Sequence, residues 1–120
     1  MSRPIHFEIL TTHPEQMAEF YHSALGWTFS AGGGSAPYWL ADTGTSAAPG
    51  INGAVMDRHF PQAVINTIEV ESLDETIRKV EAAGGKKVHG PGEIPGVGLH
   101  AYCTDPDGNF FGILQKTHAR

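Results

Sequence analysis

Three ionisable side chains lie in two stretches where apolar and polar residues alternate. His6 and Glu8 belong to Ile5–Ile9, and Glu69 belongs to Val64–Val70. Alternation with a period of two predicts strands with one packed face. Because successive side chains of a strand point to opposite faces, His6 and Glu8 share the face turned away from the apolar residues. The same reasoning places Glu69 on the corresponding face of the later strand.

These residue types could perform acid–base chemistry. If Glu8 and Glu69 face each other, the repulsion between two carboxylates raises one pKa and provides a general acid and a general base. His6 could act as a general base or as a metal ligand. The alternatives are a wall histidine bonded to Glu8 or to a backbone carbonyl, and glutamates that reach solvent at a sheet edge.

Other polar and aromatic residues could line a binding pocket. Thr67 shares the strand face of Glu69, and His100 lies beside a glycine-rich segment. Trp39 and Tyr102 could supply the aromatic lining that small-molecule sites favour. The alternative for these two aromatic residues is packing in the core or in a dimer interface.

The first half of the chain predicts one helix and four strands. A capping-box pattern, Thr12-x-x-Glu15 with Pro14, predicts the start of the helix, and Gly26 predicts its end. Gly32-Gly33-Gly34 is expected to form a loop. The strands are expected at Ile5–Ile9, Trp27–Ser30, Tyr38–Ala41 and Ile51–Met56.

The second half repeats this pattern. Ser72-x-x-Glu75 predicts a second capped helix that ends near Ala83 or Gly84. The segment Gly90–Gly98 is expected to be a loop. Strands are expected at Val64–Val70, Lys86–His89, Leu99–Thr104 and Asn109–Gln115. Asp105-Pro106-Asp107-Gly108 predicts a tight turn between the last two strands.

Each half therefore reads β-α-β-β-β. The capping boxes at Thr12 and Ser72 lie 60 residues apart, and Gly53 and Gly112 lie 59 residues apart. A repeat of this length favours duplication, with modules at about residues 4–57 and 63–116 of a single domain spanning residues 1–120. The predicted fold class is α+β, with two tandem βαβββ modules whose curled mixed sheets enclose a cavity. An unrelated α+β sandwich is the alternative.

Composition excludes several kinds of partner. The formal net charge of −5 argues against a nucleic acid or an anionic membrane surface as the partner. No run approaches the roughly 18 apolar residues of a membrane span. Cys103 is the single cysteine, so no intrachain disulfide can form, and we expect a cytoplasmic protein.

The arrangement resembles the vicinal oxygen chelate superfamily, which includes glyoxalase I, extradiol dioxygenases and bleomycin-resistance proteins. The resemblance rests on His6, Phe20-Tyr21, Leu25-Gly26-Trp27 and Asp105-Pro106-Asp107-Gly108-Asn109. It implies two paired βαβββ modules, often completed by a homodimer. It also implies a divalent metal such as Zn, Ni, Mn or Fe, bound by residues of the first and fourth strands of each module.

Carried onto this chain, the resemblance supplies one strong metal ligand. His6 matches the first-strand ligand, whereas the other positions fall on Ile65 or Thr67, on Gly53 and on Gly112. A catalytic divalent ion needs about three protein ligands. A shifted site that uses Glu8, Glu69 or His100 is the alternative.

We therefore expect a homodimer that binds a small organic molecule, with a degenerate metal site, no cofactor and no assigned reaction. The alternative function is a divalent-metal-dependent glyoxalase-like lyase or isomerase, or a dioxygenase, that uses His6. A purely structural or interaction domain is the third hypothesis. It is favoured if side chains fill the cavity.

Overall fold

The computed structural model describes residues 2–32 and 38–117. By their contacts, these residues form two compact units. The N-terminal unit is His6–Ile65, and the C-terminal unit contains the described residues from Asn66 onward together with those before His6. Gly33 and Gly34, which were expected to lie in a loop, are outside the described residues.

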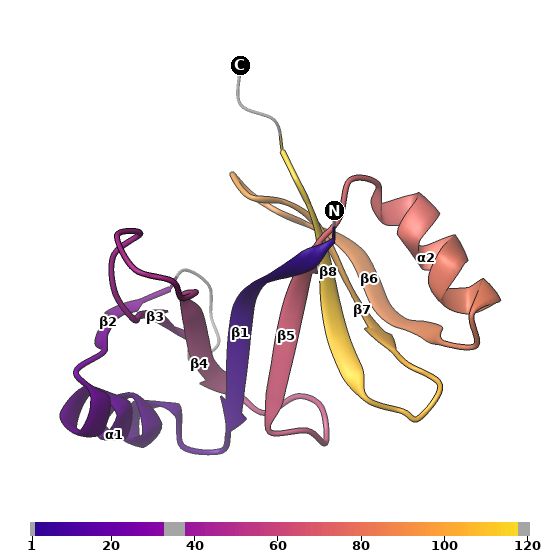
Figure 1. Ribbon diagram of the computed structural model, residues 1–120. Helices are drawn as coiled ribbons and strands as arrows, with labels where there is room; N and C mark the ends of the chain where they lie inside the picture. The colour runs from indigo at the N-terminus through magenta and orange to yellow at the C-terminus, as the bar shows by residue number, and fades with distance from the viewer. Residues whose placement is uncertain (1, 33–37, 118–120) are drawn as a thin grey trace. The chain divides into compact units, whose positions relative to one another are not determined.

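The N-terminal unit places one helix against a mixed four-stranded sheet (Figure 1). The strand order is β2-β3-β4-β1, with β1 and β4 parallel and the other neighbours antiparallel. The elements are β1 (Arg3–Thr11), α1 (Pro14–Leu25), β2 (Thr28–Ala31), β3 (Tyr38–Asp42) and β4 (Gly53–Asp57).

The C-terminal unit repeats this arrangement in the order β5-β8-β7-β6, with β5 and β8 parallel. Helix α2 lies along one face of this sheet (Figure 1). The elements are β5 (Val64–Glu69), α2 (Leu73–Ala82), β6 (Lys86–Ile94), β7 (Gly98–Thr104) and β8 (Phe110–Lys116). The predicted α+β class and the two βαβββ modules are confirmed.

The segment expected to be a loop at Gly90–Gly98 is largely strand. Strand β6 runs on to Ile94, and its register with β7 shifts between Lys87 and His89 and again between His89 and Gly92. These irregularities accommodate the glycines and Pro91 within a paired strand, which sequence alternation alone could not indicate.

The two helices begin differently. The Ser72 hydroxyl accepts a hydrogen bond from the Glu75 N–H at 3.2 Å, so the second predicted cap is confirmed. The first predicted cap at Thr12 is wrong. The N-cap of α1 is His13, which makes no side-chain cap bond, and the His13 N–H donates to the Thr11 hydroxyl at 3.0 Å. Pro14 follows in the first turn, where it needs no hydrogen-bond donor.

The turn between β7 and β8 forms as predicted. The Gly108 N–H donates to the Asp105 carbonyl at 2.9 Å. The Asp105 carboxylate accepts from the N–H groups of Asp107 and Asn109, both at 2.9 Å. The Asn109 side-chain amide also donates to this carboxylate, at 3.0 Å. The hydrogen bonds lower the pKa of Asp105, and the one from the Asn109 side chain contributes most. Gly108 has a positive φ of 87°, which favours glycine.

The core of the C-terminal unit lies between α2 and one face of its sheet. Its buried residues are Val70, Leu73, Ala101, Cys103 and Ile113. In the N-terminal unit, α1 buries Pro14 and Ala18. The large apolar side chains of Phe20 and Leu25 in α1 are 55% and 60% exposed.

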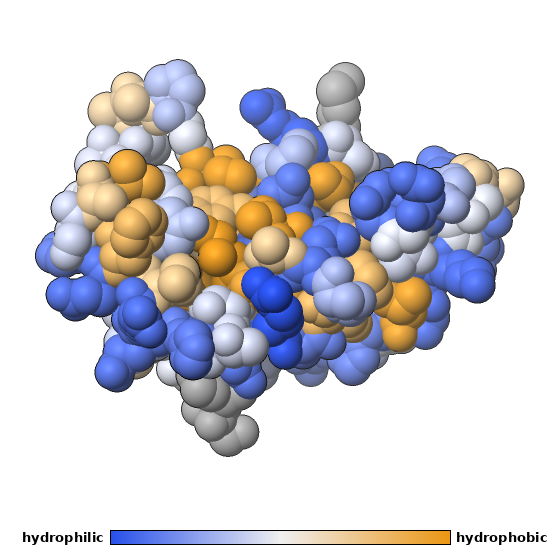
Figure 2. Space-filling model, turned by 90° about the horizontal axis from the view of Figure 1, so that it is seen from below, coloured by the Kyte–Doolittle hydropathy of each residue, from blue (hydrophilic) through white to orange (hydrophobic). Residues whose placement is uncertain are grey.

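Exposed apolar side chains of the N-terminal unit also include Leu40. Figure 2 shows a group of hydrophobic residues left of centre on the face in view. Neither helix, as far as the described residues go, is long and apolar enough to cross a membrane.

Candidate functional site

The face of the C-terminal sheet turned away from α2 carries most of the predicted pocket residues. Strand pairing aligns Thr67 with Gly112 and Gly112 with Tyr102. The neighbouring residues Ala101 and Ile113 belong to the core beneath α2. Because faces alternate along a strand, Thr67, Gly112 and Tyr102 point away from α2.

A pocket of about 360 Å³ opens on strands β6 and β7. The rings of His100 and Tyr102 meet edge to face, with centroids 4.5 Å apart, and the ring of His89 lies 6.3 Å from that of Tyr102. The lining therefore combines two imidazoles, a phenol and one carboxylate. The lining residues are His89, Gly90, Pro91, Gly92, Glu93, Ile94, His100 and Tyr102.

His100 and Tyr102, two of the predicted pocket residues, line this pocket, and so do His89 and Glu93, which were not among the predicted pocket residues. His89 was expected at the end of the strand Lys86–His89, and Glu93 in the loop Gly90–Gly98. Both lie in β6, where the two register shifts break the alternation that would assign a residue to a face.

Gly112 leaves room for the His100 ring. A Cβ built on Gly112 would lie 2.9 Å from His100 Nε2 and 3.2 Å from Thr67 Oγ1. Real Cβ atoms are essentially never found as close as 2.9 Å, so any side chain at position 112 would force the imidazole to move. Thr67 is itself buried, at 3% exposed.

In the N-terminal unit, strand β1 carries two ionisable side chains, His6 and Glu8. His6 is half-buried, and desolvation lowers its pKa. Glu8 is 6% exposed. Burial raises the pKa of the Tyr38 phenol, and the negative charge of Glu8 raises it further. His6 therefore tends to be neutral, the form that accepts a proton or binds a metal.

Trp39 and Gly53 lie on the α1 side of the N-terminal sheet. Strand pairing aligns Trp39 with Val55 and Val55 with Ile9, and Trp39 lines a groove beneath α1. A Cβ on Gly53 would meet the ring of Phe7, which in turn contacts Trp27. Gly53 and Gly112 thus face opposite sides of their sheets relative to the helix, so they are not equivalent positions.

Glu69 lies beside Lys116 at 3.8 Å, with both side chains substantially exposed. Such a pair contributes little to stability. Glu8 and Glu69 belong to different units, so their proposed action as a carboxylate pair stays a prediction. Ile65, at 0% exposed, is a buried apolar residue.

Apart from His6, the positions where the family resemblance implies metal ligands do not offer strong ligand side chains. Ile65, Gly53 and Gly112 have no donor atoms in their side chains, and Thr67 is a weak ligand. In the described part of the chain, no three His, Cys, Asp or Glu side chains cluster closely enough to hold an ion. Since a catalytic divalent ion needs about three protein ligands, these residues do not fit one.

The sequence resembles curated proteins over most of its length. It is 31% identical over 115 residues to "Putative glyoxylase CFP32" of Mycobacterium bovis and Mycobacterium tuberculosis, covering 90% of this chain. The chain spans 42% of the length of these relatives.

Solved structures share the fold at low identity. Methylmalonyl-CoA epimerase from Mycobacterium tuberculosis has a TM-score of 0.71 at 14% identity, covering 96% of this chain and 88% of that one. The hypothetical protein BH1468 from Bacillus halodurans C-125 has a TM-score of 0.70 at 15% identity, covering 99% and 97%.

The family model of the Glyoxalase/Bleomycin resistance protein/Dioxygenase superfamily matches residues 3–113, which is nearly the whole chain. The two βαβββ modules, the tight turn at Asp105–Gly108 and this match agree. The chain therefore belongs to the Glyoxalase/Bleomycin resistance protein/Dioxygenase superfamily.

Proposed function

We propose that the protein binds a small organic molecule in the pocket on β6 and β7, without a divalent ion held at the positions that metal-dependent relatives use. One observation carries this proposal. The His100 ring occupies the space that a side chain at position 112 would need. A histidine of the neighbouring strand β7 therefore fills the space beside Gly112 of β8, the position where the family resemblance implies a metal ligand.

The pocket suits a small ligand. Its volume of about 360 Å³ is within the range of small-molecule sites, which combine apolar walls with a few polar groups. Pro91 and Ile94 supply apolar surface. The rings of His89, His100 and Tyr102 can donate or accept hydrogen bonds and can stack on a planar ligand.

Elemental analysis of the purified protein, with and without prior chelation, tests the metal-independent part. We expect no stoichiometric divalent ion. A stoichiometric ion that is lost in the His6→Ala variant would overturn this part of the proposal.

Saturation-transfer NMR with a library of small fragments tests the pocket. Fragments that bind the parent protein should lose binding in His100→Ala. They should keep it in the control His13→Ala, which changes an N-cap residue without a side-chain cap bond. Equal binding by both variants would place the ligand elsewhere.

A metal-dependent glyoxalase-like enzyme, or a dioxygenase, is the second candidate. The 31% identity to a protein named as a glyoxylase favours it, as does the lowered pKa of His6, because a neutral imidazole is the metal-binding form. Hemithioacetal turnover after addition of nickel or zinc, abolished in His6→Ala, would support the glyoxalase reaction. No turnover with either metal would exclude it.

The proposal includes a homodimer and a cytoplasmic location. Large exposed apolar side chains such as Phe20, Leu25 and Leu40 favour self-association. Light scattering coupled to size-exclusion chromatography measures the molar mass directly. A mass of 12.9 kDa across the accessible concentration range would exclude the dimer.

A further inference from the structure

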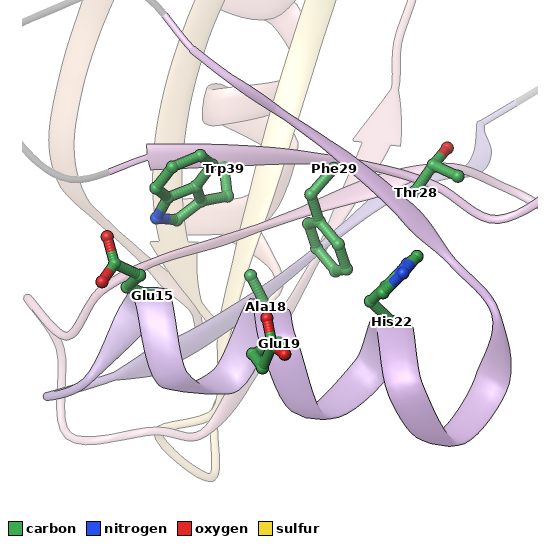
Figure 3. A pocket seen from close by; sticks show the side chains of 7 residues that line it. All are labelled: Glu15, Ala18, Glu19, His22, Thr28, Phe29 and Trp39. Atoms are coloured by element: carbon green, nitrogen blue, oxygen red, sulfur yellow. The ribbon is translucent and has the colours of Figure 1, made fainter.

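A second groove lies in the N-terminal unit, between α1 and strands β2 and β3. Its volume is about 430 Å³. It opens on the α1 side of the sheet, where Ile9 of β1 and Val55 of β4 lie. Glu8 lies on the opposite face of the sheet. The lining residues are Glu15, Ala18, Glu19, His22, Thr28, Phe29 and Trp39, shown in Figure 3.

The two walls of this groove differ in chemistry. Glu15, Glu19 and His22 are spaced four and three residues apart, so they share one face of α1. Figure 3 shows them opposite Phe29 and Trp39 of the strands. One wall is therefore acidic and the other aromatic.

The groove stays open because α1 does not fill it. The helix residue at its floor is Ala18, which is small and 7% exposed. The large apolar side chains of the helix, Phe20 and Leu25, are turned mainly to solvent. His22 is fixed at one end, where its Nδ1 lies 2.7 Å from the Trp27 carbonyl, a bond that requires the proton on Nδ1.

Among the described residues, neither Glu15 nor Glu19 has an ion-pair partner. The lining contains no lysine or arginine. Among the residues that the structure describes, the ion pairs are Lys79–Glu75 and Lys116–Glu69, both in the C-terminal unit. Two carboxylates thus border an aromatic surface, and the described residues that line the groove include no lysine or arginine.

We propose that this groove binds a small organic cation carrying an alkylated ammonium group. The face of an indole ring attracts such a cation through its quadrupole, and tryptophan is the most effective side chain for this contact. Glu15 and Glu19 add attraction from the opposite wall. The methyl or methylene groups of the ligand would cover Phe29 and Ala18.

A metal ion or an anion fits the groove less well. Hard divalent ions take six or more oxygen ligands, and the lining offers two carboxylates and the Thr28 hydroxyl. Glu15, Glu19 and His22 are not among any group of three His, Cys, Asp or Glu side chains that could hold a metal ion in the described part of the chain. An anion would be repelled by both glutamates. The combination of an aromatic face with uncompensated carboxylates selects an organic cation.

Titration with choline chloride tests this proposal, with the signal of the Trp39 indole N–H followed by NMR at constant ionic strength. Comparison with Trp39→Phe assigns the signal. The matched probe is 3,3-dimethylbutan-1-ol, which has the same shape but no charge. We expect a saturable shift with choline and binding at least about tenfold weaker for the neutral probe. No saturable shift with choline, or equal binding of both probes, would overturn the proposal.

Charge-removing variants locate the site. Glu15→Gln combined with Glu19→Gln should weaken choline binding by at least about fivefold. The control Glu71→Gln combined with Asp74→Asn removes two exposed charges from the C-terminal unit, and it should change binding by less than about twofold. Equal effects of the two double variants would show a general charge effect and would refute a site in this groove.

Discussion

Nε2 of His100 lies 2.9 Å from the point that a Cβ on Gly112 would occupy. The two residues lie on neighbouring strands, β7 and β8, and the absence of a side chain at one position creates the space for the ring at the other. The glycine therefore shapes the pocket as much as the histidine does, and this coupling can be measured.

Gly112→Ala should lower the free energy of unfolding by about 1–2 kcal/mol, because the added methyl group displaces the His100 ring. In the His100→Ala background the same change should cost less, since the contact that remains is with Thr67 Oγ1 at 3.2 Å. Urea unfolding of the two single variants and the double variant gives the coupling energy.

Gly92→Ala is the matched control, because a Cβ at Gly92 meets nothing within 4 Å. We expect a change within about 0.5 kcal/mol. An equal cost of Gly112→Ala with and without the His100 ring would show that the ring does not depend on the glycine.

Gly53→Ala should be more destabilising than Gly112→Ala. At Gly53 the new Cβ would lie 2.5 Å from both the Phe7 ring and the Phe7 carbonyl oxygen, and a backbone oxygen cannot move aside as a side chain can. We expect a loss of about 3 kcal/mol or more in urea unfolding. Because the backbone contact persists, Phe7→Leu should not rescue it. Full rescue by that second change would show that the ring alone causes the strain.

The same two glycines show how far sequence reasoning reaches. The repeat and the turn residues at Asp105–Gly108 predicted the βαβββ modules, since these signals depend on local geometry. The faces of Gly53 and Trp39 were not predicted, because strand register depends on pairing between distant segments. Likewise, the irregular pairing of β6 hid His89 and Glu93 from any alternation rule.

Helix capping provides a test of local geometry with an internal control. Ser72→Ala should lower the free energy of unfolding by about 1 kcal/mol, because the Glu75 N–H loses its side-chain acceptor. The corresponding change in the first module, Thr12→Ala, should have an effect within about 0.5 kcal/mol, since His13 is the N-cap of α1. Urea unfolding measures both. Equal costs would mean that Thr12 caps α1 in solution after all.

The burial of His6 predicts a specific dependence of stability on pH. Desolvation lowers its pKa below the ordinary value of 6.5 in the folded protein. Well above pH 6.5 the imidazole is neutral in both the folded and the unfolded chain, so its burial does not make stability depend on pH there. As the pH falls from 6.5 through the lowered pKa, the unfolded chain binds a proton that the folded chain does not, and stability decreases.

Urea unfolding between pH 7.5 and pH 5 measures this effect. The parent protein should lose more stability over this range than His6→Gln, whose side chain is polar but does not titrate. NMR titration of the His6 ring should show directly that its pKa lies below 6.5. If the stabilities of the parent protein and the variant fall in parallel with pH, desolvation of His6 does not control the proton balance of folding.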